Sequence, residues 1–135
     1  MSSGQNKRLC FVIAAAFLLA LLIACSSEDS GSSWYEGGTL NDASALQWQD
    51  ASYSNKLATC ADFVATMDSD GQFVASVDND INTVEDIRPY AEELVTAIDE
   101  AFAEEDDPER NRQMYANQSV AETAVILMQL MGWTR

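Results

Sequence analysis

The sequence predicts an all-α fold for residues 34–135, a small bundle of four or five helices. Apolar residues recur there at steps of three and four, which is the period of one helix face. Residues that can cap a helix stand in front of these stretches. A third observation is that no stretch alternates long enough to predict a strand, because Val74 interrupts the short alternation of Phe73, Ala75 and Val77.

The first two helices are expected near residues 43–52 and 55–68. Asn41 or Asp42 can cap the first helix, and Ser54 or Asn55 can open the second. The apolar face of the second helix is formed by residues at steps of three and four: Leu57, Cys60, Ala61, Val64 and Met67. Residues 71–83 are poorly patterned, and we expect a loop that turns Phe73 inward.

The third helix is expected near residues 84–103. Thr83 and Asp86 imitate a capping box with Asp in place of the usual Glu, and Pro89 is tolerated because it lies near the start of the helix. The apolar positions of this helix are Ile87, Tyr90, Ala91, Leu94, Ile98, Ala101 and Phe102.

The last helical segment is expected near residues 109–131, with Pro108 restarting the chain and Ser119 and Glu122 as a capping box. From Ala124 to Met131 only Gln129 is polar, which predicts a helix end buried on all sides. Gly132 can cap it, with Trp133 folded back.

The N-terminus has the composition of a secretory signal peptide. Lys7 and Arg8 precede a 16-residue apolar run from Leu9 to Ala24, and a Ser-, Gly- and acid-rich stretch covers residues 26–33. The run ends in Leu22-Ile23-Ala24-Cys25, which resembles the lipobox of bacterial lipoproteins. An uncleaved transmembrane helix needs about 20 apolar residues, more than this run offers. An ordinary secretory signal and an uncleaved anchor are the remaining alternatives.

The resemblance implies that the Cys25 thiol receives a diacylglycerol, that the chain is cut before Cys25, and that a fatty acid such as palmitate acylates the new amino group. It divides the chain into a signal peptide (1–24), a lipidated tether (25–33) and a helical domain (34–135). In Gram-negative lipoproteins, Ser rather than Asp after the cysteine accompanies transfer to the outer membrane. Ser26 therefore predicts an anchor in the periplasmic face of the outer membrane.

The charge of the chain restricts its partners. All 22 acidic residues lie after the expected cut, whereas Lys7 and Arg8 are removed, so the mature charge is about 5 − 22 = −17. A field of this sign repels nucleic acid, which excludes it as a partner, and favours a cationic protein. The membrane is the other expected partner, reached through the lipid anchor. The same charge is also typical of a protein kept soluble in a saline habitat.

The sequence predicts a non-catalytic protein without a cofactor. It contains no histidine, no Gly-rich phosphate loop and no CxxC pair. Once Cys10 is removed and Cys25 is lipidated, Cys60 is the remaining thiol, and its place on an apolar helix face predicts core packing. Catalytic and metal-binding residues are therefore expected to be absent, and Cys25 is the one site residue.

Two further function classes stay open beside an interaction domain of the cell envelope. The first is an acidic inhibitor or immunity protein against a cationic enzyme. The second is a calcium-binding envelope protein that uses the Asp-rich stretches at 68–71 and 78–82, although neither fits the EF-hand loop. Trp34, Tyr35, Trp48 and Tyr53 are aromatic residues that predict either core positions or a binding surface.

Overall fold

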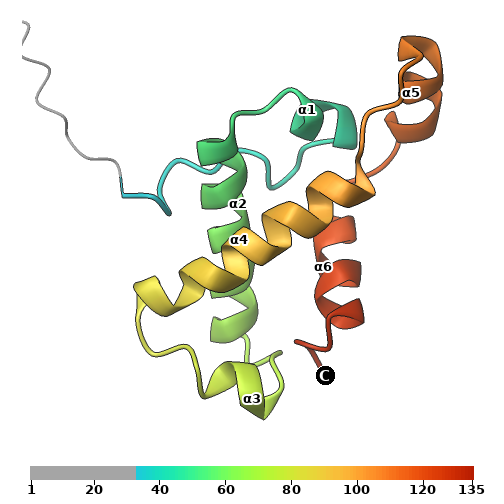
Figure 1. The fold of residues 1–135 in the computed structure, drawn as a ribbon. Helices are drawn as coiled ribbons and strands as arrows, with labels where there is room; N and C mark the ends of the chain where they lie inside the picture. Colours follow the sequence, from blue (N-terminus) through green and yellow to red (C-terminus); the bar gives the residue numbers. More distant parts are fainter. Residues whose placement is uncertain (1–32) are drawn as a thin grey trace, which may run out of the picture. The chain divides into compact units, whose positions relative to one another are not determined.

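The structure, a computed structural model, describes residues 33–135, and the predictions for the signal peptide and Cys25 lie outside these residues. Within them the chain forms α1 (Ala45–Gln49), α2 (Tyr53–Ser69), α3 (Ala75–Asp78), α4 (Val84–Ala101), α5 (Pro108–Tyr115) and α6 (Val120–Leu130) (Figure 1). Residues 33–135 contain isolated bridges but no strand. The all-α prediction is confirmed, with six helices instead of four or five.

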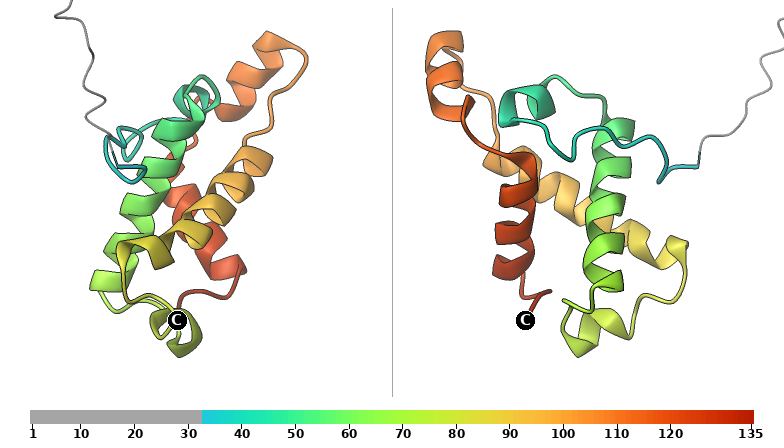
Figure 2. Two further views of the ribbon diagram at one scale, coloured as in Figure 1. Left: turned by 60° about the vertical axis from the view of Figure 1, so that its left-hand side comes forward. Right: turned by 180° about the vertical axis from the view of Figure 1, so that it is seen from behind.

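Helix α4 is the centre of the fold. It crosses both α2 and α6, which lie behind it in the view of Figure 1 and in front of it in the right-hand view of Figure 2. Each of the three helices turns an apolar face to this crossing, and the fully buried side chains there include Cys60, Val64, Leu94, Ile98 and Met128. None of the described helices is both long and apolar enough to span a bilayer.

The first two helices begin at other caps than the sequence predicts. Ser44 caps α1: its hydroxyl accepts from the Gln47 backbone N–H at 3.4 Å, and the Gln47 side chain accepts from the Ser44 N–H at 2.9 Å. Ser52 caps α2. The predictions of Asn41 or Asp42, and of Ser54 or Asn55, are therefore wrong. Ser44 lies nearer the start of α1 than Asn41 and Asp42 do, and α2 begins earlier than predicted, so that Ser54 and Asn55 lie within it and Ser52 satisfies its free N–H groups.

Residues 71–83 are not wholly a loop, since they contain the single turn of α3. Phe73 is fully buried, as predicted. Its neighbour Val74 donates its N–H to the Trp133 carbonyl at 2.8 Å, and the Arg135 N–H reaches the Gln72 carbonyl at 3.1 Å. The C-terminal residues thus hold this segment, and the predicted return of Trp133 is confirmed.

The expected helix over 109–131 is divided in two, and that prediction is wrong. The break at residues 116–119 coincides with contacts to the chain before α1, where the Ala45 N–H donates to the Gln118 carbonyl at 2.9 Å and the Val120 N–H donates to the Ala43 carbonyl at 3.0 Å. These bonds satisfy backbone groups that a continuous helix would pair internally. Ser119 caps α6, as predicted.

Helix α6 ends as the sequence predicts but is not buried on all sides. Gly132 has φ +74°, and the N–H groups of Gly132 and Trp133 bond back to the carbonyls of Gln129 and Met128, which is a Schellman cap. One side of α6 packs on α4 through Ala124 and Met128. The opposite side is open to solvent, so the prediction of a fully buried helix is wrong.

Candidate functional site

The chain enters the domain through residues 33–40, the entry segment, which is bound to α2 near its end. Asn55 accepts the Thr39 N–H at 2.9 Å and donates its amide to the Thr39 hydroxyl at 2.8 Å, and Thr59 accepts the Leu40 N–H at 3.2 Å. Gly38 lies so close to α2 that a Cβ atom there would be 2.6 Å from the Thr59 backbone nitrogen. Residues 38–40, which follow the predicted tether (25–33), are therefore held against α2.

The four aromatic residues do not share one environment. Trp48 is fully buried and donates its indole N–H to Asp99 at 2.8 Å, so the core prediction is confirmed for it. Trp34 and Tyr35 are half-buried against the core, and Tyr53 is 57% exposed. No single aromatic surface is formed by all four.

Trp34 is nevertheless held by polar partners from α4. Its indole N–H donates to Glu85 at 3.3 Å, and the Arg88 guanidinium lies 5.4 Å from its ring centre. The Tyr35 ring meets it edge-on at 5.5 Å. These contacts join the entry segment to the first turns of α4, and Glu92 holds Arg88 from the other side through an ion pair of 2.9 Å.

Cys60 is a core residue, as predicted. Its side chain is fully buried, and burial together with the nearby Asp99 carboxylate raises the pKa of the Cys60 thiol far above its usual range. A thiol that does not ionise is a poor nucleophile and a poor metal ligand. Lys56, which bonds Asp99 at 2.8 Å, lies over the Trp48 ring and completes this region.

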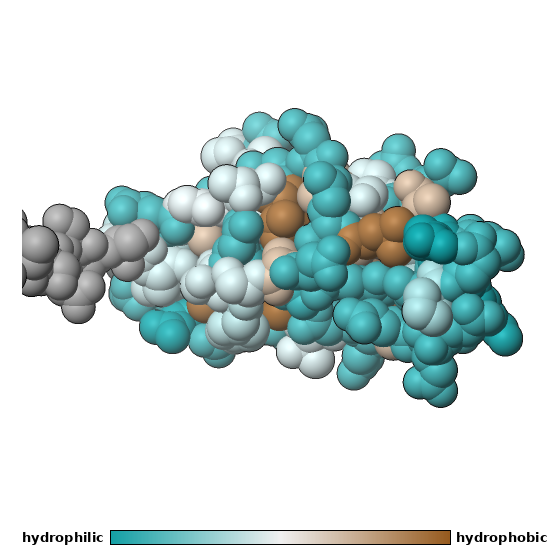
Figure 3. Space-filling model, turned by 90° about the horizontal axis from the view of Figure 1, so that it is seen from above, coloured by the Kyte–Doolittle hydropathy of each residue, from teal (hydrophilic) through white to brown (hydrophobic). Residues whose placement is uncertain are grey.

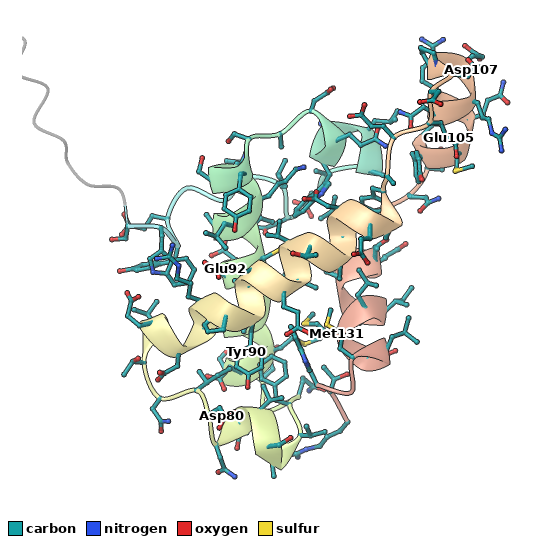
Figure 4. All side chains as sticks on the ribbon, in the orientation of Figure 1. Asp80, Tyr90, Glu92, Glu105, Asp107 and Met131 are labelled. Carbon is teal, nitrogen blue, oxygen red and sulfur yellow. The ribbon has the colours of Figure 1, made fainter. Side chains whose placement is uncertain are left out.

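The feature with the clearest chemistry is an acidic groove between the α3–α4 loop and α4. It has a volume of about 450 Å³ and is lined by Asp80, Glu85, Asp86, Pro89, Tyr90 and Glu93. The Tyr90 hydroxyl donates to Asp80 at 3.0 Å, and Figure 4 shows Asp80 beneath Tyr90. Burial and then the contact with Asp80 raise the pKa of Tyr90, which therefore stays a neutral donor.

Three of the four carboxylates in this acidic groove already have donors, and the donor to Asp80 is the Tyr90 hydroxyl. Asp86 accepts the N–H of Asn82 at 3.0 Å, the Thr83 hydroxyl at 2.9 Å and the Thr83 N–H at 2.8 Å. These three bonds lower the pKa of Asp86. Glu85 accepts from Trp34. The groove can attract an ammonium or guanidinium group, because four negative charges line it and fixed donors hold part of the set in place.

The structure does not gather the Asp-rich stretches predicted as a calcium alternative. Asp70 is the cap at the end of α2, Asp78 closes α3, and Asp80 enters the acidic groove. Among residues 33–135, no three acidic or cysteine side chains are grouped so as to hold a metal ion. Calcium binding thus stays a prediction that no contact in this part of the chain supports.

Most of the basic side chains of the domain are already paired. Lys56 binds Asp99, Arg88 binds Glu92, Arg110 binds Glu105 at 3.3 Å, and Arg112 binds Glu109. The surface therefore carries a large excess of unpaired carboxylates. Figure 3 shows one face of the molecule, which is hydrophilic over most of its area with hydrophobic residues in small areas near its middle.

The sequence singled out Asp80 only as a possible calcium ligand and did not connect it with Glu93, because the groove depends on how the α3–α4 loop folds against α4. The sequence signal that was present is the run Asp78 to Asp86, which contains four acidic residues. No family model, curated protein or solved structure matches this chain.

Proposed function

We propose that this protein is a lipid-anchored, non-catalytic lipoprotein of the bacterial cell envelope, whose helical domain acts by binding. The lipobox-like Leu22-Ile23-Ala24-Cys25 at the end of the apolar run carries this proposal. Residues 26–33 reach at most about 27 Å when extended, so the domain would stay close to the membrane. Hydrogen bonds from Thr39 and Leu40 to α2 hold the N-terminal end of the domain, to which the tether would connect.

The absence of catalysis is supported by residue chemistry. The chain contains no histidine, and Cys60, the thiol left to the domain, is buried with a raised pKa. The acidic groove offers carboxylates, one bound tyrosine hydroxyl and no nucleophile with a neighbouring base. Such a site fits binding of a cationic group better than bond-breaking.

Incorporation of labelled palmitate into the full chain, expressed in a bacterium, tests the anchor. We expect labelling of the native chain and none of Cys25→Ala. The matched control is Cys10→Ala, which removes a thiol from the same apolar run and should leave labelling unchanged. Equal labelling of Cys25→Ala and the native chain, or none in either, would contradict the anchor.

The final membrane is tested separately by fractionation of a Gram-negative host. We propose the periplasmic face of the outer membrane because Ser26 follows the cysteine. Ser26→Asp should then move the labelled protein to the inner-membrane fraction, whereas Ser27→Asp, which adds the same charge one position later, should not. A native chain already in the inner-membrane fraction would refute this location.

The acidic groove favours a second candidate, an inhibitor or immunity protein against a cationic enzyme. Electrostatic attraction would speed the encounter, and the carboxylates of Asp80 and Glu93 would receive a basic side chain. Pull-down from envelope extracts and rival-cell toxins should recover one partner that survives about 0.15 M salt, where charge attraction is screened beyond roughly 8 Å.

The charge-matched comparison decides whether the acidic groove is responsible. Asp80→Asn with Glu93→Gln should abolish capture of that partner. Asp62→Asn with Glu122→Gln removes the same charge elsewhere and should leave capture intact. Salt-labile recovery of many basic proteins, reduced equally by both pairs of substitutions, would show that the charge serves solubility alone.

A further inference from the structure

The open side of α6 is the most hydrophobic exposed surface of the described domain. Leu130 is 79% exposed, Ile126 54% and Val125 39%, and we call these three residues the α6 face. Side chains of this size with these exposures amount to roughly 300 Å², the scale at which an apolar patch on a monomer is often functional. α6 lies on the other side of the molecule from the entry segment (Figures 1 and 2).

The α6 face is also nearly free of charge in a strongly acidic protein. All acidic residues except Glu28, Asp29 and Glu122 lie between Glu36 and Glu109. Residues 113–134 contain Glu122 as their one charged side chain. Negative charge is therefore concentrated between residues 36 and 109, and α6 presents an apolar surface outside this part of the chain.

We propose that a second copy of this chain covers the α6 face, in a symmetric dimer. A two-fold contact places the same residues of both copies against each other. With a charge near −17 on each mature chain, most such contacts would oppose carboxylates, which costs free energy. The α6 face is the described surface on which two copies meet without that cost, whereas a cationic partner would be drawn to the acidic faces.

The Glu122 side chains favour one relative direction of the two α6 helices. A two-fold axis through the middle of α6, near Ile126, makes the two helices antiparallel. At a rise of 1.5 Å per residue, the two Glu122 side chains then lie roughly 12 Å apart along the helices, farther than the screening length of about 8 Å at physiological salt. A parallel pair would instead place the two glutamates side by side.

The size of the α6 face indicates a weak, reversible dimer. About 800 Å² per partner is usual for a stable interface, and the α6 face supplies less than half of that. A method that traps short-lived contacts in the cell is therefore appropriate. We choose oxidative crosslinking of the full chain with a cysteine at position 125, which lies next to the proposed axis and where Cys keeps a small apolar side chain.

Under mild oxidation of expressing cells, Val125→Cys should give a higher yield of disulfide-linked dimer than the native chain does. The yield from the native chain measures any contribution of Cys25. Ala65→Cys, an exposed small residue of α2, should stay at that level. In the Val125→Cys chain, Leu130→Glu should reduce the dimer by about tenfold or more, since the antiparallel arrangement places position 130 of one copy opposite Glu122 of the other, where like charges repel. Tyr53→Glu, at an exposed aromatic residue outside α6, should leave the yield unchanged.

Equal dimer yields from Val125→Cys and Ala65→Cys would mean random collision and would overturn the proposal. The proposal would also be overturned if no variant gave a dimer, or if the cysteine at position 125 formed a crosslink to a different protein. Circular dichroism tests whether each variant is folded, and Leu130→Ser replaces Leu130→Glu where the glutamate variant is not folded.

Discussion

The packing around Gly38 shows how much one residue contributes to the placement of the entry segment. A Cβ atom at this position would lie 2.6 Å from the Thr59 nitrogen and 2.8 Å from the carbonyl carbon of Ala58. Both are backbone atoms of α2 and cannot turn aside. The bonds from Thr39 and Leu40 to α2 depend on this close approach.

We predict that Gly38→Ala destabilises the domain by about 1–3 kcal/mol, the usual cost of overpacking. Urea unfolding measures the change. Ser33→Ala, in the same segment but before the contact, is the control and should change stability little. An effect of Gly38→Ala below about 0.5 kcal/mol would mean that the segment shifts away from α2 without loss.

Buried leucines differ in what they contribute. Leu94 is fully buried in the centre of α4, so we predict that Leu94→Ala costs about 2–5 kcal/mol in urea unfolding. The helix pattern predicts the same cost for Leu127, but the structure leaves that side chain half-buried, so its cost should be smaller. Leu130→Ala is the control and should be near neutral. A larger loss at Leu127 than at Leu94 would contradict the observed faces of α4 and α6.

At the scale of the element, the start of α4 depends on an ionised side chain. Asp86 is half-buried and accepts three hydrogen bonds from Asn82 and Thr83, and these lower its pKa below the ordinary value of 3.8. The carboxylate lies at the positive end of the helix, where negative charge is favourable. The α3–α4 loop and the first turn of α4 are thereby joined at one point.

The sign of the pH effect follows from the lowered pKa. The ionised Asp86 stabilises the folded state at pH above 3.8, and this contribution is lost as the pH falls through the lower pKa of the folded state. We predict that Asp86→Ala is less stable than the native chain at pH 6 and that the difference shrinks below pH 3.8. Glu122→Ala is the comparison, and an Asp86→Ala difference that stays constant down to low pH would contradict the cap.

At the scale of the whole molecule, like charges oppose folding. The described basic side chains Lys56, Arg88, Arg110 and Arg112 are each paired, which leaves most carboxylates without a cationic neighbour. Exposed pairs of this kind contribute little stability. Repulsion among the remaining carboxylates is therefore the larger electrostatic effect, and it is screened by salt.

We predict that the Tm of the domain rises when NaCl is increased from about 0.01 M to 0.5 M, where the screening length falls from roughly 30 Å to a few ångströms. A gain of about 1 kcal/mol would raise the Tm by about 4–8 °C in a domain of this size. KCl should act equally, since screening does not depend on the cation. A Tm that falls with salt would show that the ion pairs outweigh the repulsion.

Local patterns were sufficient to predict the class of the fold and several of its parts. The three- and four-residue spacing predicted α2 and α4, because a helix face that is buried must repeat with the period of the helix. The burial of Cys60 and Phe73, the acidic cap Asp86 and the glycine end of α6 were also predicted, and each depends on a few neighbouring residues. Cys25 and the lipid anchor remain predictions of the sequence, outside the described residues.

The remaining features depend on contacts between residues far apart in the chain. Backbone hydrogen bonds to Ala43 and Ala45 form where residues 109–131 break into two helices. No pattern within residues 109–131 indicates these distant partners. The acidic groove needs Asp80 beside α4, and the exposure of the α6 face follows from α6 meeting α4 on one side only. Periodicity shows which side of a helix is apolar, but only tertiary packing decides whether a second helix is there to cover it.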